Sequence, residues 1–153
     1  MTVVSIAIRP ADPGDYDAVV PDIDRWWGGR HMATMLPRLF FTHFRPWTYV
    51  AEQQGTTVGF LAGFRSQTHP EQAYCHFIGV APACRGHGVG EALYWRLFAD
   101  AAAVGCRDVL AVTAPTNHGS IAFHMKLGFT TLDGISQEAG VPFTPEYDGP
   151  GED

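Results

Sequence analysis

Hydrophobic and polar residues alternate in several short stretches of the chain, which is the pattern of half-buried β-strands. The stretch VSIAIRPA (4–11) predicts a first strand that ends at its proline. Two alternating runs, 48–54 and 56–67, meet around Gly55, and this spacing predicts a β-hairpin. Residues 72–82 form one more alternating run, again stopped by a proline. The first half of the chain therefore predicts a sheet built from at least four strands.

Between these strands, and after the last of them, apolar residues recur at the spacing of a helix. Residues 12–29 open with capping residues and close on two glycines, which predicts a helix interrupted near Pro21. A second helical stretch is expected over 30–44. The clearest helix is 88–104, where Val89, Leu93, Leu97, Ala101 and Val104 recur on one side before Gly105.

The last third of the chain alternates strand and helix. Residues 107–114 predict a buried strand, 117–128 a short helix that stops at Gly128, and 129–134 another strand. A hairpin sheet followed by strand–helix–strand crossovers indicates a mixed α/β or α+β fold with helices on the faces of the sheet. Because 153 residues lie within the usual size of one domain, a single domain over 1–153 is expected.

Composition and charge argue against several classes of binding partner and ligand. The net charge is −6 and there is no cluster of basic residues, which argues against nucleic acid as a ligand. No stretch reaches the roughly 20 apolar residues of a membrane span, and the N-terminus does not resemble a signal peptide, so a cytoplasmic protein is expected. The three cysteines have no metal-ligand spacing, so we expect buried, reduced thiols and no metal site.

A glycine-rich segment, ACRGHGVGEAL (83–93), lies between a predicted strand and the long helix. The first turn of a helix presents free N–H groups and a partial positive charge, so such a junction is suited to a phosphate group. The segment lacks the G-x-G-x-x-G pattern of dinucleotide-binding folds, and it lacks the Lys-Ser/Thr pair of a P-loop. It does match R-x-x-G-x-G, through Arg85, Gly88 and Gly90.

In this motif the chain resembles the GNAT superfamily of acyl-CoA-dependent N-acyltransferases. The wider match V-x-P-x-x-R-G-x-G-x-G runs from Val80 to Gly90, and NHGSIAFHMKLGF (117–129) is similar to the closing segment of that superfamily. The resemblance implies a mixed, mostly antiparallel sheet that is splayed open beside the strand 72–81, with acetyl-CoA or coenzyme A bound there. The implied coenzyme A-binding residues are Ile78, Gly79, Val80, Arg85, Gly86, His87, Gly88, Val89, Gly90, Asn117, Ser120 and Phe123.

The same resemblance implies the catalytic groups. A bulge at Gly79 would free the Val80 amide to stabilise the oxygen of the thioester as it gains charge. His76 is the candidate base: on strand alternation it shares a face with Tyr74 and Ile78, and a histidine stands at this place in the arylalkylamine N-acetyltransferases. A hydrogen bond within the sheet would explain His76 equally well.

The candidate acid differs from the usual pattern of the superfamily. His124 stands where many members carry a tyrosine, and it would protonate the leaving thiolate if a nearby charge raised its pKa. It could equally hydrogen-bond the sulfur or pack within its helix. Asn117, in turn, could cap that helix rather than contact pantetheine.

The sequence indicates less about the acceptor substrate than about the coenzyme. Trp26, Trp27 and Tyr74, near Asp22 and Asp24, would suit a cationic or aromatic amine, although aromatic residues at this density often pack helices onto a sheet. The expected function is transfer of an acetyl group to a small-molecule primary amine. A catalytically silent acyl-CoA-binding module and a protein amine acetyltransferase are the alternatives. The acidic, Pro/Gly-rich C-terminus offers no obvious last strand, which leaves dimerisation through an unpaired edge open.

Overall fold

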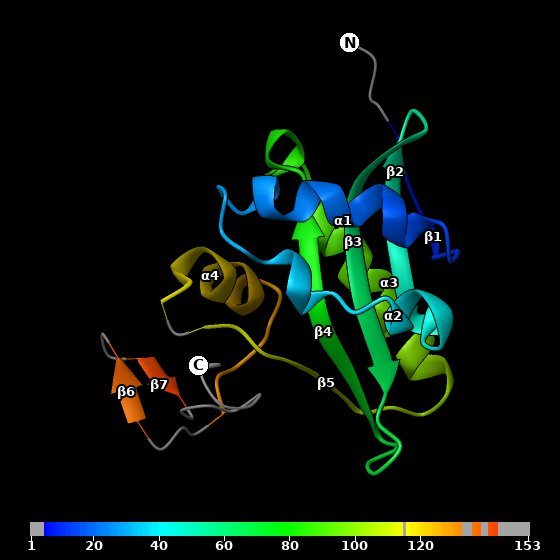
Figure 1. Ribbon diagram of the computed structural model, residues 1–153. Coiled ribbons are helices and arrows are strands. Elements are labelled where there is room, and N and C mark those ends of the chain that lie inside the picture. The colour runs from blue at the N-terminus through cyan, green and yellow to red at the C-terminus, as the bar shows by residue number, and fades with distance from the viewer. Residues whose placement is uncertain (1–4, 115, 133–135, 139–140, 144–153) are drawn as a thin grey trace. The chain divides into compact units, whose positions relative to one another are not determined.

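A computed structural model describes residues 5–114, 116–132, 136–138 and 141–143. The chain forms two compact units, residues 1–111 and 112–153. The first unit holds a five-stranded sheet (Figure 1). Its strands are β1 (Ile6–Pro10), β2 (Thr48–Gln53), β3 (Thr56–Arg65), β4 (Gln72–Val80) and β5 (Asp108–Ala111). Its α-helices are α1 (Asp15–Trp26), α2 (Leu39–Thr42) and α3 (Val89–Ala103), with 3₁₀ turns η1 (Ala33–Met35), η2 (Arg45–Trp47) and η3 (Pro82–Cys84).

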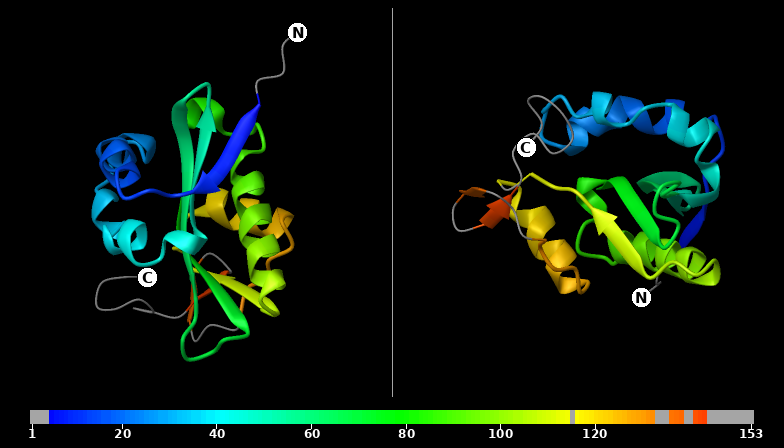
Figure 2. Two further views of the ribbon diagram at one scale, coloured as in Figure 1. Left: turned by 90° about the vertical axis from the view of Figure 1, so that its right-hand side faces the viewer. Right: turned by 90° about the horizontal axis from the view of Figure 1, so that it is seen from below.

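The strands lie in the order β1-β2-β3-β4-β5. The first three pairings are antiparallel and the pairing of β4 with β5 is parallel, which confirms a mixed, mostly antiparallel sheet. The predicted hairpin is present as β2 and β3, joined at Gln54 and Gly55. Helices cover both faces: α1 and α2 lie on one side and α3 on the other (Figure 2).

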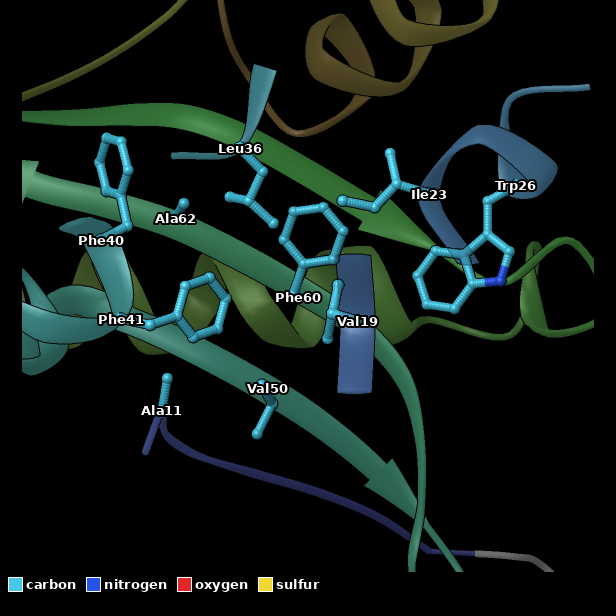
Figure 3. Packing of buried hydrophobic residues seen from close by; sticks show 10 residues of the cluster. All are labelled: Ala11, Val19, Ile23, Trp26, Leu36, Phe40, Phe41, Val50, Phe60 and Ala62. Atoms are coloured by element: carbon cyan, nitrogen blue, oxygen red, sulfur yellow. The ribbon is translucent and has the colours of Figure 1, made fainter. Parts of the chain in front are cut away.

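Helix α1 packs through an apolar stripe. Val19, Ile23 and Trp26 are spaced at i, i+4 and i+7, and all three are buried against Phe60 and other core side chains of the sheet (Figure 3). The prediction of an interruption near Pro21 is wrong, because the helix runs through this residue. Burial of the stripe on both sides of the proline offsets the loss of one backbone hydrogen bond.

The long helix predicted over 30–44 is also wrong. This segment contains only η1 and α2, with Pro37 between them. Leu36, the residue before the proline, has φ −113° and ψ 86°, outside the helical region. The ring of a following proline disfavours helical backbone at this position, so the chain turns here instead of continuing.

Helix α3 confirms the most regular apolar pattern of the sequence except at Val104, which follows the helix and is 46% exposed. Val89, Leu93, Leu97 and Ala101 are buried on the face of the sheet opposite α1. The helix is held in register by Asp100, whose carboxylate accepts a hydrogen bond of 2.6 Å from the Tyr49 hydroxyl of β2.

The second unit contains the helix α4 (His118–Lys126) and a two-stranded sheet of β6 (Ser136–Glu138) and β7 (Val141–Phe143). Residues 129–132 form no strand, which corrects the strand predicted over 129–134, whose last two residues lie outside the described part of the chain. Strand β5 is shorter than predicted and only half-buried, since it pairs with β4 along one edge.

Candidate active site

Strand β4 has an open edge along its second half. Its pairing with β5 begins at Gln72 and ends at Cys75, opposite Ala111. Ala81 donates its N–H to Val58 on the β3 side at 2.8 Å. Since N–H groups alternate in direction along a strand, those of Ile78 and Val80 point toward the side on which β5 no longer pairs. This arrangement is the splayed sheet that the sequence predicted.

The bulge in β4 lies at His76 and not at Gly79. Phe77 pairs with Ala62 and Cys75 pairs with Gly63, so His76 is the extra residue. A bulge places two successive side chains on one face of a sheet. His76 and Phe77 accordingly both face the helices α1 and α2.

The alternation continues beyond the bulge with the opposite phase. Gly79 faces the same helices as Phe77, because a Cβ built on it would meet Trp27 and Phe60. Ile78 therefore points to the other face, and the predicted sharing of one face by His76 and Ile78 is wrong. Tyr74 does lie on the His76 face, where it stacks on Phe64 with ring centroids 5.3 Å apart.

His76 is half-buried between a backbone carbonyl and an aromatic ring. Its Nε2 lies 2.6 Å from the carbonyl oxygen of Met35, in η1. Its ring stacks on Phe40 at 4.8 Å with an interplanar angle of 11°. Since a carbonyl only accepts hydrogen bonds, Nε2 carries the proton, and in the neutral ring Nδ1 is left as an acceptor. Both the packing role and the basic role considered from the sequence are compatible with this arrangement.

Trp27 approaches β4 closely. A Cβ on Gly79 would stand 2.5 Å from Cη2 of Trp27 and 2.7 Å from Cε1 of Phe60, so only glycine leaves room for these rings. Trp27 also stacks on Phe77, with ring centroids 5.0 Å apart. Trp27, Phe77 and Gly79 thus form an apolar wall beside the open edge, which we call the Trp27 wall.

The other predicted substrate residues are placed differently. Trp26 is only 5% exposed and stacks on Phe60 in the core, so it does not line a surface site. Asp22 forms an ion pair with Arg25. The Asp24 carboxylate accepts hydrogen bonds from the backbone N–H groups of Ala33 and Met32, and these bonds lower its pKa. Asp24 therefore fixes the loop after α1.

The glycine-rich segment forms the turn from η3 into α3. Gly86 and Gly88 have φ angles of +80° and +83°, a conformation that side chains disfavour, and Gly88 caps the helix. A Cβ at either position would meet nothing within 4 Å. His87 is exposed, whereas Val89 and Gly90 are buried in the first turn of α3. The first N–H groups of a helix have no partner within it, and no side chain among the described residues caps α3, so this open turn is suited to a phosphate group.

Arg85 makes its contacts with the protein itself. Its Nε donates to the carbonyl oxygen of Val80 at 3.1 Å, and its Nη2 donates to that of Trp26 at 2.6 Å. The sequence predicted a contact with a diphosphate, and gave no signal for these two carbonyls.

In the second unit, α4 has both of its ends capped. The side chain of Asn117 accepts a hydrogen bond of 3.2 Å from the N–H of Ser120. At the other end Gly128 has φ +102°, and the N–H of Phe129 donates to the carbonyl of His124. The Gly-Phe pair of the closing motif therefore ends the helix in a Schellman arrangement.

His124 lies on the buried side of α4. Its Nδ1 is 2.7 Å from the carbonyl oxygen of Ser120, so this nitrogen carries a proton. Burial lowers the pKa of His124, against an opposing effect of the Ser120 hydrogen bond. A raised pKa was the condition for His124 to act as an acid, and the structure does not meet it. Phe123, its neighbour, contacts the His124 ring edge to face.

The cysteine thiols and the potential metal ligands of the described residues form no metal site. Only Cys75 is fully buried; Cys84 and Cys106 are partly exposed, which corrects the expectation that all three are buried. Among the described residues, no group of three or more His, Cys, Asp or Glu side chains could hold a metal ion. No helix in the described part of the chain has the length and apolar character needed to cross a membrane.

The sequence profile of the acetyltransferase (GNAT) family matches residues 16–129, which include the open edge of β4, the glycine turn and α4. The chain belongs to this family. The family assignment confirms the resemblance that the two sequence motifs indicated.

Two curated GNAT relatives share part of the sequence. An L-2,4-diaminobutyric acid acetyltransferase of Nocardia farcinica is 35% identical over 75 residues, which are 49% of this chain and 39% of that protein. An acetyltransferase of Pectobacterium atrosepticum is 34% identical over 87 residues, 57% of this chain and 60% of that protein. The chain thus spans less than two thirds of the length of either relative.

A solved GNAT structure supports the fold. The diaminobutyrate acetyltransferase of Paenibacillus lautus, in complex with L-2,4-diaminobutyric acid and coenzyme A, superposes with a TM-score of 0.69 at 24% identity. The superposition covers 82% of this chain and 75% of that protein. At this identity the likeness concerns the fold alone.

Proposed function

We propose that this protein is an acetyl-CoA-dependent N-acetyltransferase that acts on a primary amine of a small molecule, with residues 1–153 forming one acetyltransferase domain. The observation that carries the proposal is the open edge of β4, where the N–H groups of Ile78 and Val80 have no strand partner in the described sheet. This edge leads directly into the glycine turn at the start of α3.

The residues present fit acetyl-CoA as co-substrate, which supplies the acetyl thioester. The first-turn N–H groups of α3, with Gly86, His87 and Gly88, are suited to its diphosphate. The free backbone groups of β4 from Ile78 to Val80 are suited to its pantetheine amides. Asn117, Ser120 and Phe123 remain coenzyme A-binding residues that the sequence resemblance predicts.

Two groups of β4 have the properties that amide formation requires. The N–H of Val80 can donate a hydrogen bond to an oxygen that gains negative charge, and no side chain is needed for this. Nδ1 of neutral His76 can accept a proton from the ammonium group of the acceptor, directly or through water, so that the neutral amine attacks the thioester, while Nε2 stays bonded to Met35. Because burial lowers the pKa of His124, we assign no proton donation to this residue.

The Trp27 wall favours a small acceptor with an apolar portion next to its amine. The curated relative and the solved structure that act on or bind 2,4-diaminobutyric acid make short diamino acids the first class to test. A cytoplasmic location and a homodimer remain predictions from the sequence.

The test is thiol release from acetyl-CoA with a panel of amines: 2,4-diaminobutyrate, an aminoglycoside, an arylalkylamine and a peptide with a free N-terminus. We expect release with at least one small amine. Coenzyme A at about a hundred times its Kd should raise the free energy of unfolding by about 2.7 kcal/mol. Stabilisation without release for any amine would indicate the silent binding module instead, and release with the peptide alone would indicate a protein acetyltransferase. Absence of both effects would refute the proposal.

A further inference from the structure

The side chain of Arg85 joins the ends of two elements that flank the proposed acceptor site. Its Nε donates to the carbonyl of Val80, the last residue of β4. Its Nη2 donates to the carbonyl of Trp26, the last residue of α1. The second bond is the shorter, at 2.6 Å against 3.1 Å.

The carbonyl of Trp26 depends on this side chain because the last carbonyls of a helix have no partner within it. Backbone N–H groups after the helix donate to the carbonyls of Ile23, Asp24 and Arg25. Trp26 instead accepts from the Arg85 guanidinium. A positive charge at the C-terminal end of a helix is also favoured by the helix dipole.

We propose that Arg85 is a positioning residue for the acceptor site, and that it acts through Trp26 and not through the diphosphate of coenzyme A. By holding the last turn of α1 against the end of β4, it keeps Trp27, the next residue, in contact with Phe77 and Gly79. The inference rests on the proposed function, because the Trp27 wall matters only if an acceptor binds beside it.

The experiment compares wild type with Arg85→Gln. Arg25→Gln is the matched control. It also removes one positive charge near the end of α1, but from a side chain that is 73% exposed. Three quantities are measured: hydrogen exchange of the amides of residues 23–29 without ligand, the Kd of coenzyme A, and KM for 2,4-diaminobutyrate or another amine that wild type acetylates.

For Arg85→Gln we expect exchange and the amine KM to rise by about tenfold, as for loss of a charge-assisted hydrogen bond, with the Kd of coenzyme A within about twofold. Arg25→Gln should change none of the three. Arg85→Lys, which can donate to one carbonyl but cannot fork to both, should restore part of the protection. This variant also serves if Arg85→Gln fails to fold.

A weaker affinity for coenzyme A with unchanged exchange in α1 would overturn the inference, because the arginine would then act on the diphosphate. Faster exchange with an unchanged amine KM would overturn it as well. If wild type acetylates no amine, the proposed function fails, and unchanged exchange in Arg85→Gln would still refute the contact with Trp26 separately.

Discussion

Nε2 of His76 donates a hydrogen bond to the carbonyl of Met35 at 2.6 Å, and this contact fixes which nitrogen of the ring is free to accept a proton. His76 shares a face of β4 with Tyr74, and this face is turned toward the segment that connects α1 to α2. A residue on a strand and a carbonyl forty-one positions earlier together determine the proposed base.

Replacing His76 with Gln tests this assignment. The Gln amide can still donate to the Met35 carbonyl, but it has no basic nitrogen. We expect kcat to fall by about 10²- to 10⁴-fold, the usual contribution of a general base, with the Kd of coenzyme A unchanged. His69→Gln, at a side chain that is 60% exposed, is the control. Wild-type turnover in His76→Gln would leave this histidine a purely structural role.

Gly79→Ala tests the Trp27 wall. The new Cβ would stand 2.5 Å from Trp27 and 2.7 Å from Phe60, so at least one ring must move. Overpacking of this kind costs about 1–3 kcal/mol, and we also expect KM for the amine to rise. Urea unfolding measures the first effect. Gly119→Ala in α4, where a Cβ meets nothing within 4 Å, should be neutral or stabilising. Equal behaviour of the two variants would argue against the close approach of Trp27.

Gly88→Ala separates backbone strain from packing. This residue has φ +83° and open space around its Cβ, so the substitution costs about 1–2 kcal/mol through the backbone alone. The added methyl group also enters the space in front of the first turn of α3, and we expect weaker binding of coenzyme A by calorimetry. Gly14→Ala, at φ −68° and equally open, should leave both stability and binding nearly unchanged. Undiminished affinity in Gly88→Ala would place the diphosphate elsewhere.

The sequence predicted well those features that depend on neighbouring residues in the chain. The hairpin at Gly55, the buried stripe of α3 and the glycine turn before it all follow from local spacing, and the structure contains them. The end of α4 at Gly128 is of the same kind. Each of these signals lies within one short stretch of the chain.

Features that depend on distant residues were not predictable. Nothing near His76 indicates that β3 shifts its register opposite to it, and the position of the bulge decides which side chains share its face. The different positions of Trp26, buried in the core, and Trp27, partly buried beside β4, likewise depend on Phe60 and Gly79. Arg85 was recognised through its motif, but its partners at Val80 and Trp26 come from the fold.

Cys75 should be the least reactive thiol of the protein. Its side chain is 2% exposed, and burial raises the pKa of its thiol to about 12. Alkylation requires the thiolate, so iodoacetamide at pH 8 should modify Cys84 and Cys106 well before Cys75. Mass spectrometry of the digested protein measures the order of modification. In urea the three rates should become similar, whereas equal rates in the native protein would contradict the burial of Cys75.

The lowered pKa of His124 gives a prediction about pH. Because burial favours the neutral ring, the unfolded chain binds the proton more tightly, and the stabilisation is fully present above the ordinary pKa of about 6.5. It is lost as the pH falls through the lower folded value. A titration followed by NMR at the His124 ring should give a midpoint below that of the same histidine in urea. A midpoint above the urea value would restore His124 as a candidate acid at neutral pH, whereas a lower one would agree with the absence of a proton-donating role for it in our proposal.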